Sequence, residues 1–396
     1  MKRRSFVKSA LLGLPAVPVA NRLLGAEAGT DLLITGGRVI DPASGIDAMV
    51  DVAVRDGIIT SVGRDLFPNA LQIVDVGGRL VVPGLIDVHV HARDAELPPA
   101  ANFSDGVTTL VDAGSRGAGN IDSIIRIGEA APNRLRILLN IGMYGNNPGG
   151  RSEFLDGIAT GDVGMARAAI HEHRDWIVGV KARLSRGVSA ERDLQVLKRA
   201  ILASEPFGIP VMIHIGDTST PLPQLLSQLR PGDIVTHMYA PTPNGILDDN
   251  GRLLPEVRAA RRRGIRFDFG NGLNEHWDWT VAEAAMAQDF PPDTISSDLN
   301  VPGRNAQVFN LPNVLSKFMV LGMSPGEVIA CATQNAAATF SEFSDLGTLK
   351  PGAIADIAIL DLAEGEFDFV DNYGGHRTGS RKLSPSRVYF GGVAAL

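Results

Sequence analysis

Four histidines stand at the ends of short apolar runs and could together bind metal ions. They are His89, His91, His214 and His237. In an extended strand, residues i and i+2 point to the same face, so His89 and His91 would face one point. Buried imidazoles cost free energy unless a partner satisfies them, and a metal ion satisfies several at once. A lone histidine is usually an ordinary polar residue, but four histidines that each end an apolar run predict a metal centre.

Two other ionisable residues end apolar runs of the same kind. Asp298 ends residues 294–298, and a carboxylate beside a metal ion can be both a ligand and a proton carrier. Lys181 ends residues 177–181 in a chain that has 7 Lys and 30 Arg. A primary amine can capture carbon dioxide as a carbamate, which would convert Lys181 into a carboxylate that bridges two metal ions. An ion pair between Lys181 and an acid on the rim is an equally good interpretation.

We expect the other four histidines at the surface or in loops. His171 and His173 lie in a polar stretch that is typical of a helix end. His276 and His376 are interpreted in the same way. None of the four belongs to the predicted metal centre.

The apolar runs alternate with helical patterns through the middle of the chain. Helices are predicted over residues 191–204 and 279–288, and Ser324-Pro325-Gly326-Glu327 predicts a capped helix start. Eight strand–helix units are typical of a (β/α)8 TIM barrel, an α/β fold whose functional residues gather at the carboxyl ends of the strands. The predicted strands cover residues 85–90, 107–112, 135–141, 177–181, 209–214, 234–237, 265–269 and 294–298.

Both ends of the chain predict β-structure. Between residues 31 and 83, Gly36-Gly37, Asp56-Gly57 and Gly77-Gly78 separate β-branched runs and predict tight hairpins, because such turns need positive φ. Residues 355–360 and 387–390 have the same character. We expect the two ends to pair into one small β-sandwich domain, residues 29–83 plus 347–396, beside a catalytic barrel of residues 84–346.

Residues 1–28 resemble an export signal. Arg3 and Arg4 precede a short uncharged run, residues 9–21, and Ala26-Glu27-Ala28 then offers small residues at the spacing of a cleavage site. Paired arginines are typical of a twin-arginine signal, which predicts a periplasmic or secreted bacterial protein. The run is too short to cross a bilayer and no other segment resembles a span, so none is expected in the mature chain.

The composition limits the classes of partner that we expect. The chain has 396 residues, is 44% hydrophobic and 20% charged, and carries a formal net charge of −7. This is ordinary for a globular protein and argues against nucleic acid as the main partner. The single cysteine, Cys331, excludes an internal disulfide framework and a cysteine-ligated metal site. We expect a small-molecule substrate, and a homo-oligomer is compatible with the sequence.

Two motifs resemble the amidohydrolase superfamily of metal-dependent hydrolases. They are residues 82–91, Val-Pro-Gly-Leu-Ile-Asp-Val-His-Val-His, and residues 349–356, Leu-Lys-Pro-Gly-Ala-Ile-Ala-Asp. Residues 106–115 and 311–318 resemble a narrower branch, the dihydroorotase-like deacetylases that act on N-acetyl or O-acetyl carboxylic acids. The resemblance covers nearly the whole chain after the predicted signal.

The resemblance implies a binuclear zinc centre in which a metal-bridging hydroxide attacks the substrate. N6-carboxylated Lys181 would be the second bridge between two Zn²⁺ ions. Asp298 would also take a proton from the attacking water and pass it to the leaving group. One metal would be held by His89, His91 and Asp298, and the other by His214 and His237.

The resemblance also bears on the substrate. Arg93 matches the spacing at which dihydroorotases bind a substrate carboxylate, which suits a fork-shaped guanidinium. An ion pair with Asp94 or Glu96 is the alternative. Histidines of the branch usually stand where this chain has Asn271 and Asn300, so two positions near the substrate depart from the pattern.

The function implied is an exported zinc-dependent hydrolase, most simply a deacetylase of small acyl acids. A dihydroorotase or another cyclic amidase is the first alternative, and a dipeptidase is another. A non-catalytic binding homologue is the remote one, because no metal position is lost. The loops that would select the substrate, residues 144–151 and 239–252, carry no readable code.

Overall fold

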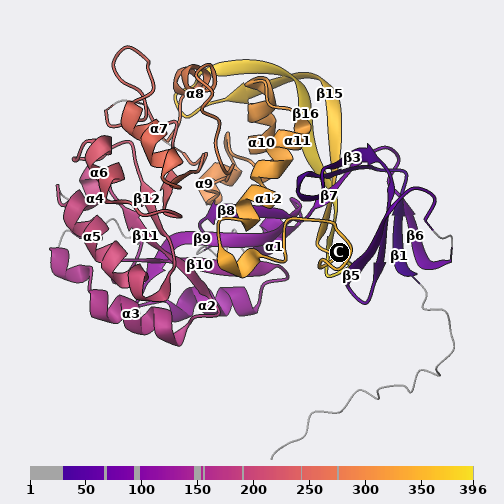
Figure 1. Cartoon of the computed structure of the whole chain (residues 1–396), viewed down its shortest axis with the longest axis horizontal. Helices are drawn as coiled ribbons and strands as arrows, with labels where there is room; N and C mark the ends of the chain where they lie inside the picture. The colour runs from indigo at the N-terminus through magenta and orange to yellow at the C-terminus, as the bar shows by residue number, and fades with distance from the viewer. Residues whose placement is uncertain are drawn as a thin grey trace, which may run out of the picture.

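The computed structural model describes residues 30–66, 69–92, 99–146, 153–154, 157–189, 191–241, 243–273 and 276–395. Its larger part is a parallel sheet wrapped by helices, and its smaller part consists of two further sheets (Figure 1). The predicted export signal and Arg93 lie outside the described residues. Within those residues, no helix is long and apolar enough to cross a membrane.

Seven parallel strands form the central sheet of the larger part, in the order β14-β13-β12-β11-β10-β9-β8. Their sequences are nearly continuous apolar runs because both faces of the sheet are buried. Each starts and ends close to its predicted bounds, except that β9 is longer and β14 shorter. The strands are β8 (Leu85–Val90), β9 (Val107–Gly117), β10 (Arg134–Asn140), β11 (Ile177–Arg183), β12 (Val211–His214), β13 (Ile234–Thr236) and β14 (Arg266–Phe267).

The predicted eighth strand is a bonded segment rather than a regular strand. Thr294 forms a parallel bridge with Asp268, and Leu299 forms one with Val90. The amide of Asp298 donates to the carbonyl of His89 at 2.7 Å. Asp298 itself has a φ of 47°, so the backbone is not extended there. Residues 294–299 thus join both edges of the sheet, and the fold is TIM-barrel-like.

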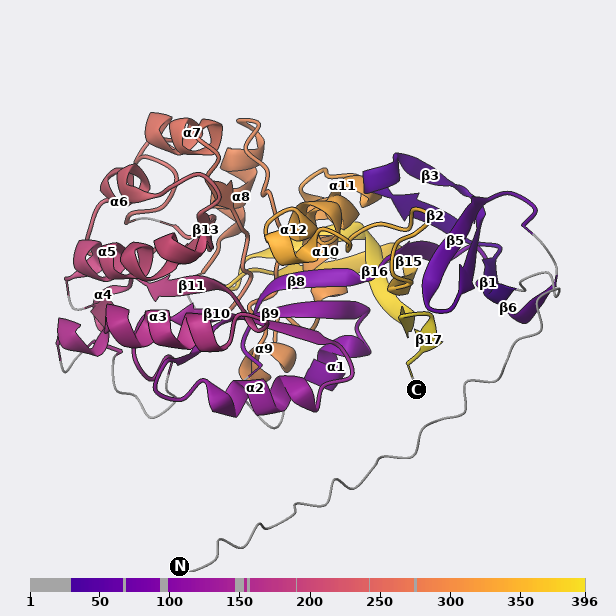
Figure 2. The same cartoon turned by 60° about the horizontal axis from the view of Figure 1, so that its bottom comes forward.

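Helices cover the outside of this sheet (Figure 2). The capped start at Ser324 is confirmed, because its hydroxyl and the Glu327 side chain form the predicted capping box. The longer helices are α2 (Asp122–Glu129), α3 (Val163–Glu172), α5 (Asp193–Ser204), α6 (Leu222–Gln228), α7 (Pro255–Arg262), α8 (Trp279–Met286), α10 (Leu311–Val320) and α11 (Pro325–Cys331). The short ones are α1 (Pro99–Phe103), α4 (Arg186–Ser189), α9 (Val301–Arg304) and α12 (Gln334–Ala337).

The two chain ends share a sheet, as expected. The order β17-β16-β15-β7-β2-β3 places strands from both ends side by side, and a second sheet has the order β5-β4-β1-β6. Side chains of both sheets share one apolar cluster. The sandwich arrangement and the domain boundaries stay predictions. The strands are β1 (Thr30–Thr35), β2 (Arg38–Asp41), β3 (Ile46–Met49), β4 (Asp51–Arg55), β5 (Ile58–Gly63), β6 (Ala70–Asp75), β7 (Leu80–Pro83), β15 (Ile357–Val370), β16 (His376–Phe390) and β17 (Val393–Ala394).

Two of the three predicted hairpins are wrong. Asp56-Gly57 does join an antiparallel pair, β4 and β5. At Gly36-Gly37 and Gly77-Gly78, however, the chain leaves one sheet and enters the other, because β1 pairs with β6 and β2 with β7. The two crossings lie against each other, since the amide of Gly78 donates to the carbonyl of Gly36. Gly36, Gly77 and Gly78 do supply positive φ, but for a sheet switch rather than for a hairpin.

The long hairpin of β15 and β16 leaves the small sheets and reaches over the barrel (Figure 1). It packs on α10, where the amide of Leu383 donates to the hydroxyl of Ser316 at 2.9 Å. Its tip holds a loop of the barrel, because Asn372 donates to the carbonyl of Gly272 at 3.0 Å. The far carboxyl end of the chain therefore supports the rim on which the predicted site lies.

Candidate metal centre

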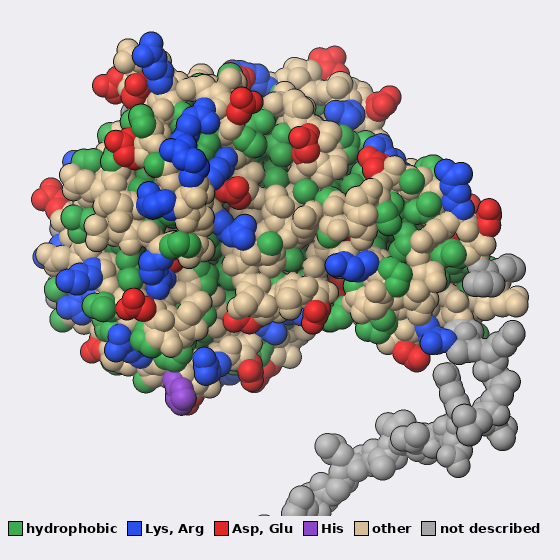
Figure 3. Space-filling view, in the orientation of Figure 1, with side chains coloured by type: hydrophobic (Ala, Val, Ile, Leu, Met, Phe, Trp, Pro, Cys, Tyr) green, Lys and Arg blue, Asp and Glu red, His purple; other side chains and the backbone are tan. Residues whose placement is uncertain are grey.

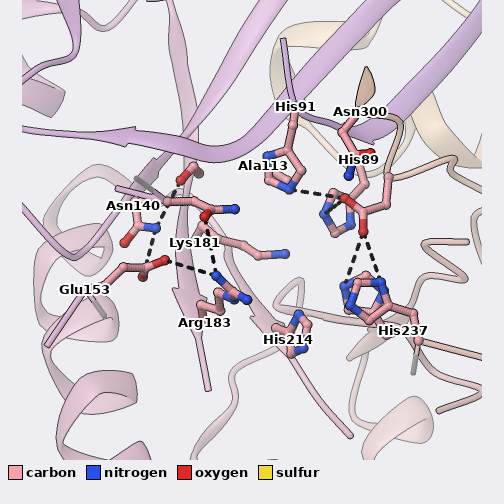
Figure 4. A pocket seen from close by; sticks show the side chains of 14 residues that line it. His89, His91, Ala113, Asn140, Glu153, Lys181, Arg183, His214, His237 and Asn300 are labelled. Atoms are coloured by element: carbon pink, nitrogen blue, oxygen red, sulfur yellow. Dashed lines mark hydrogen bonds and ion pairs between the residues drawn. The ribbon is translucent and has the colours of Figure 1, made fainter. Parts of the chain in front are cut away.

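The predicted metal ligands meet in one cavity at the carboxyl ends of the barrel strands (Figure 4). His89 and Lys181 are almost fully buried, and His91 lies beside them at the end of β8. The alternation of β8 also places Asp87 on the face that carries His89 and His91. Five residues, defined here as the histidine wall, form one side of the cavity: His89, His91, His214, His237 and Asp298.

The tautomer of His89 follows from its neighbours. Its Nδ1 lies 2.9 Å from the hydroxyl of Thr236, and that hydroxyl donates to Asp268 at 2.7 Å. A hydroxyl that donates to a carboxylate is left to accept, so Nδ1 of His89 carries the proton. The lone pair of His89 Nε2 therefore points into the cavity. A carboxylate-linked partner of this kind is typical of metal-binding histidines.

His237 is fixed in the same tautomer by the backbone. Its Nδ1 lies 2.8 Å from the carbonyl oxygen of Gly270, which can only accept. His237 follows the end of β13 and has a φ of 63°, so its ring leaves the strand direction and turns toward the other histidines. The lone pair of His237 Nε2 is also directed into the cavity.

These lone pairs face the carboxylate of Asp298. Oδ1 of Asp298 lies 3.3 Å from Nε2 of His89 and 3.1 Å from Nε2 of His91, and Oδ2 lies 4.0 Å from Nε2 of His237. Oδ1 is buried without a hydrogen bond to any described residue. Acceptors that face acceptors repel each other unless a cation lies between them. The donor set of imidazole nitrogens and a carboxylate fits a divalent metal ion such as zinc.

The electrostatics of the wall agree with this geometry. Burial, together with the positive charge of Lys181, lowers the pKa of His89 to about 4. Burial also lowers the pKa values of His214 and His237 well below the ordinary range. Burial alone would raise the pKa of Asp298, but the neighbouring imidazoles outweigh it and hold that pKa well below its usual value. His89, His214 and His237 are therefore neutral and Asp298 is ionised, and these are the forms that bind metals.

Lys181 lies beside the histidine wall without a good partner for its amine. Its Nζ donates to the sulfur of Met212 at 3.4 Å, the only hydrogen bond of this amine among the described residues. Burial lowers the pKa of Lys181 to about 8, against the pull of Asp298 and Asp268. A Cβ on Gly114 would lie 2.7 Å from the Lys181 side chain, so only glycine leaves room for it there. The expected ion pair with a rim acid is not formed within 4.0 Å among these residues.

One expectation about the histidines holds only in part. His276 stands on a loop, as expected, but it lines the cavity and stacks on His237 with ring centroids 4.0 Å apart. Its Nδ1 lies 3.2 Å from Oδ2 of Asp298. It stands on the loop after β14, at the carboxyl ends of the strands, and this position could have identified it. The polar sequence around His276 predicted exposure to solvent, but a polar loop at the carboxyl ends of barrel strands can face the site as well as solvent.

The two asparagines that depart from the branch pattern have structural partners. Asn271 is buried, and its Oδ1 accepts from Nζ of Lys317 at 2.8 Å. Asn300 lines the cavity, and its side chain caps α9 by accepting from the amide of Gly303 at 2.9 Å. Neither residue contributes an imidazole to the site, and His276 is the additional imidazole that the cavity contains.

The opposite side of the cavity is polar and was not foreseen. Four residues, defined here as the arginine wall, form it: Asn140, Asn146, Glu153 and Arg183. Arg183 lies two residues after Lys181 on β11, so the two side chains share a face. Applying the i and i+2 rule at Lys181, as at His89, would have found it. Arg93, expected to contact the substrate, lies outside the described residues.

Comparison with known proteins identifies the family of this chain. The amidohydrolase family matches residues 80–393 of the chain. A deacetylase from Enterococcus faecalis is similar over 371 residues at 29% identity, which covers 91% of this chain and 98% of that protein. A dihydroorotase from Geobacter sp. strain M21 is 41% identical over 103 residues, only 26% of this chain and 23% of that protein.

Solved structures resemble the whole fold. A crystal structure described as an adenine deaminase has a TM-score of 0.85 at 28% identity and covers 92% of this chain and 99% of its own. One described as a dihydroorotase has a TM-score of 0.84 at 28% identity, covering 92% of this chain and 97% of its own. With the family matched over most of its length and the site built as above, the chain belongs to the amidohydrolase family and is a hydrolase that acts on carbon–nitrogen bonds.

Proposed function

We propose that this chain is an exported, zinc-dependent amidohydrolase that removes the acetyl group from small N-acetyl or O-acetyl carboxylic acids. One observation carries the hydrolytic part of the proposal. The lone pairs of His89 and His237 converge on the carboxylate of Asp298 beside the amine of Lys181. The acetyl part is supported by the E. faecalis relative named a deacetylase, which aligns over 98% of its own length.

The donor set fits two divalent cations rather than one. Two groups of three residues each bring their ligand atoms within 4.8 Å of one another, and the groups share His237: His214, His237 and His276, and His89, His237 and Asp298. We assign one ion to His89, His91 and Asp298, and the other to His214 and His237. Among the described residues, the amine of Lys181 has one hydrogen bond, to a thioether. This amine would add to carbon dioxide and lose a proton, and the resulting carbamate would serve as a ligand to both ions. Two such ions would lower the pKa of a water molecule and polarise the scissile carbonyl.

The residues of the chain then divide the remaining work. Asp298 is ionised and buried, so it can accept a proton from the attacking water and return it to the leaving nitrogen or oxygen. Thr236 and Gly270 hold the rings of His89 and His237 in place during the reaction. Arg93, which lies outside the described residues, is one candidate for binding the carboxylate of the substrate.

Dihydroorotate ring opening is the second candidate. It is favoured by the local identity of 41% over 103 residues to the Geobacter dihydroorotase and by the fold match at a TM-score of 0.84. The same Asp298 and ligand set would serve it, since a cyclic amide needs the same attack. The predicted export signal in residues 1–28 opposes it, because pyrimidine synthesis belongs in the cytoplasm.

The test is hydrolysis of one panel by the zinc-loaded protein. The panel holds N-acetyl-D- and N-acetyl-L-amino acids, acetylated 2-hydroxy acids and dihydroorotate. Release of acetate with a preference for one enantiomer supports the proposed deacetylase activity. Ring opening of dihydroorotate without acetate release replaces it by the second candidate. Signal cleavage after Ala28 in a bacterium with twin-arginine transport, abolished by Arg3→Lys and Arg4→Lys together, tests the export.

A further inference from the structure

The cavity has a cation that the metal centre does not use. Arg183 ends β11, two residues beyond Lys181 and on the same face. It is the register partner of His214 on the adjacent parallel strand β12. Register partners on neighbouring strands lie about 5 Å apart, so the guanidinium stands beside a metal ligand at the cavity mouth. Its side chain is 36% exposed, whereas that of Glu153 beneath it is 2% exposed.

The contacts of Arg183 leave most of its guanidinium open. Its Nη1 lies 3.4 Å from Oδ1 of Asn146 and 3.9 Å from Oε1 of Glu153. Both contacts use the same nitrogen, and neither is a short, well-formed pair. Nε and Nη2 form no hydrogen bond or ion pair with any described residue. Figure 4 shows the guanidinium between Glu153 and His214.

Glu153 is anchored separately and holds Arg183 only loosely. Asn140 donates to Oε2 of Glu153 at 3.0 Å and to the carbonyl of Gly114 at 3.0 Å. Oε1 of Glu153, the atom nearest to Arg183, is buried without a hydrogen bond to any described residue. A guanidinium used only as a structural partner would form the bidentate pair that such a carboxylate offers. Here the fork faces the cavity instead.

We propose that Arg183 is a carboxylate-binding residue that selects small acids whose carboxylate is α to the scissile nitrogen or oxygen. The inference rests on the proposed function for the identity of the scissile bond. In such acids the carboxylate carbon lies about 3–4 Å from the scissile carbonyl carbon, three bonds away. If the scissile carbonyl of such a substrate lies at the histidine wall, the carboxylate of the same substrate would therefore lie beside Arg183, the register partner of His214. Nε and Nη2 would bind the two oxygens, while Nη1 keeps its place against Asn146 and Glu153.

The test compares a matched pair of substrates that share one scissile bond. N-acetylalanine carries the carboxylate, and N-acetylalaninamide replaces it by a neutral amide of the same shape. We expect the wild type to prefer the acid in kcat/KM, and Arg183→Met to lose about 10- to 100-fold of that preference, as when a charge-assisted hydrogen bond is removed. Arg183→Lys, which keeps the charge without the fork, should fall between them. Arg126→Met, exposed on α2, is the control and should keep the preference.

Two outcomes would overturn the inference. An unchanged acid-to-amide ratio in Arg183→Met would make Arg183 a structural residue, and so would a ratio lost only in Arg93→Met. Zinc content and melting temperature are measured for each variant, and if Arg183→Met loses metal, the ratio in Arg183→Lys decides.

Failure of the proposed function looks different. If the wild type hydrolyses neither compound, both are titrated by calorimetry into wild type and Arg183→Met. If the acid binds more tightly than the amide and this difference depends on Arg183, the carboxylate site is supported and only the proposed deacetylase activity is rejected. Equal affinities of acid and amide, or no binding of either, overturn the carboxylate site as well.

Discussion

The two walls of the cavity differ in how firmly their polar atoms are held. On the histidine wall, Thr236 fixes His89 and the Gly270 carbonyl fixes His237, each at 2.8–2.9 Å. On the arginine wall, Arg183 is held by contacts of 3.4 and 3.9 Å. Reacting groups gain from rigid placement, because a small displacement costs rate. A guanidinium that exchanges its partners for a substrate needs the looser setting.

The burial of the two walls follows the same division. His89, His237 and Asp298 are each at most 3% exposed, which strengthens every charge interaction among them. Arg183 is 36% exposed at the mouth of the cavity. The wall that we propose for the reaction is therefore the more deeply buried one, and the wall that we propose for recognition is open to the solvent from which a substrate arrives.

Removal of Lys181, which lies beside the histidine wall, should have the largest effect on activity. We expect Lys181→Ala to lose activity by at least about 10⁴-fold together with one metal equivalent, because the bridge between the ions is gone. Zinc analysis and hydrolysis rates check this. Formate or propionate added with zinc should restore part of the activity, since a free carboxylate fills the space of the carbamate. Full activity of Lys181→Ala would remove the bridging role.

Asp298→Asn separates metal binding from proton transfer on the same wall. Asparagine keeps an oxygen toward His89 and His91 but cannot accept a proton, so we expect bound zinc and a turnover lower by about 10³-fold. Metal content and kcat measured on the same preparation check this. Turnover near that of the wild type would exclude Asp298 as the proton carrier.

His276→Asn tests whether His276, which the sequence did not predict as a site residue, takes part in the reaction at the histidine wall. His276 stacks on His237 and lies 3.2 Å from Asp298 Oδ2, so its loss should lower kcat by about 10-fold or more. Both zinc ions should stay bound, because the six assigned ligands are untouched. Loss of one zinc equivalent would instead make His276 a ligand. His376→Asn, on an exposed residue of β16, is the matched control.

The sequence predicted the site best where the chain is a regular strand. The i and i+2 rule placed His89 and His91 on one face of β8, and strand ends located Lys181 and His214. Each of these residues follows an apolar run whose length and direction are fixed by burial in the barrel. The same regularity explains why seven of the predicted barrel strands lie close to their predicted bounds.

Prediction failed where the backbone leaves regular geometry. The loop after β14 contains Gly270 and Gly272, both with positive φ, and it brings His276 to Asp298 through contacts that no local pattern encodes. The glycine pairs at residues 36–37 and 77–78 failed for a related reason. Positive φ can be read from glycine, but the sheet that the chain enters afterwards is decided by long-range pairing.

The smallest effect concerns the support behind the histidine wall. Lys317 on α10 is fully buried, and its Nζ donates to Asn271 Oδ1 at 2.8 Å and to the carbonyl of Val370 at 3.0 Å. It thereby ties the loop that holds His237 to the β15–β16 hairpin. Burial lowers the pKa of Lys317 to about 7, against the pull of Asp371.

This depressed pKa makes the stability of the wild type rise with pH. Below pH 7 the amine is charged in both the folded and the unfolded state, and folding carries the full cost of burying the charge. Between about pH 7 and 10.5 the folded amine is neutral while the unfolded one still binds a proton, so the free energy of unfolding increases, by at most about 1.4 kcal/mol per pH unit. Lys317→Met should lack this increase. Urea midpoints at pH 7, 8 and 9, with exposed Lys350→Met as the control, measure it, and parallel curves for wild type and Lys317→Met would show that Lys317 is charged in the folded protein across this range.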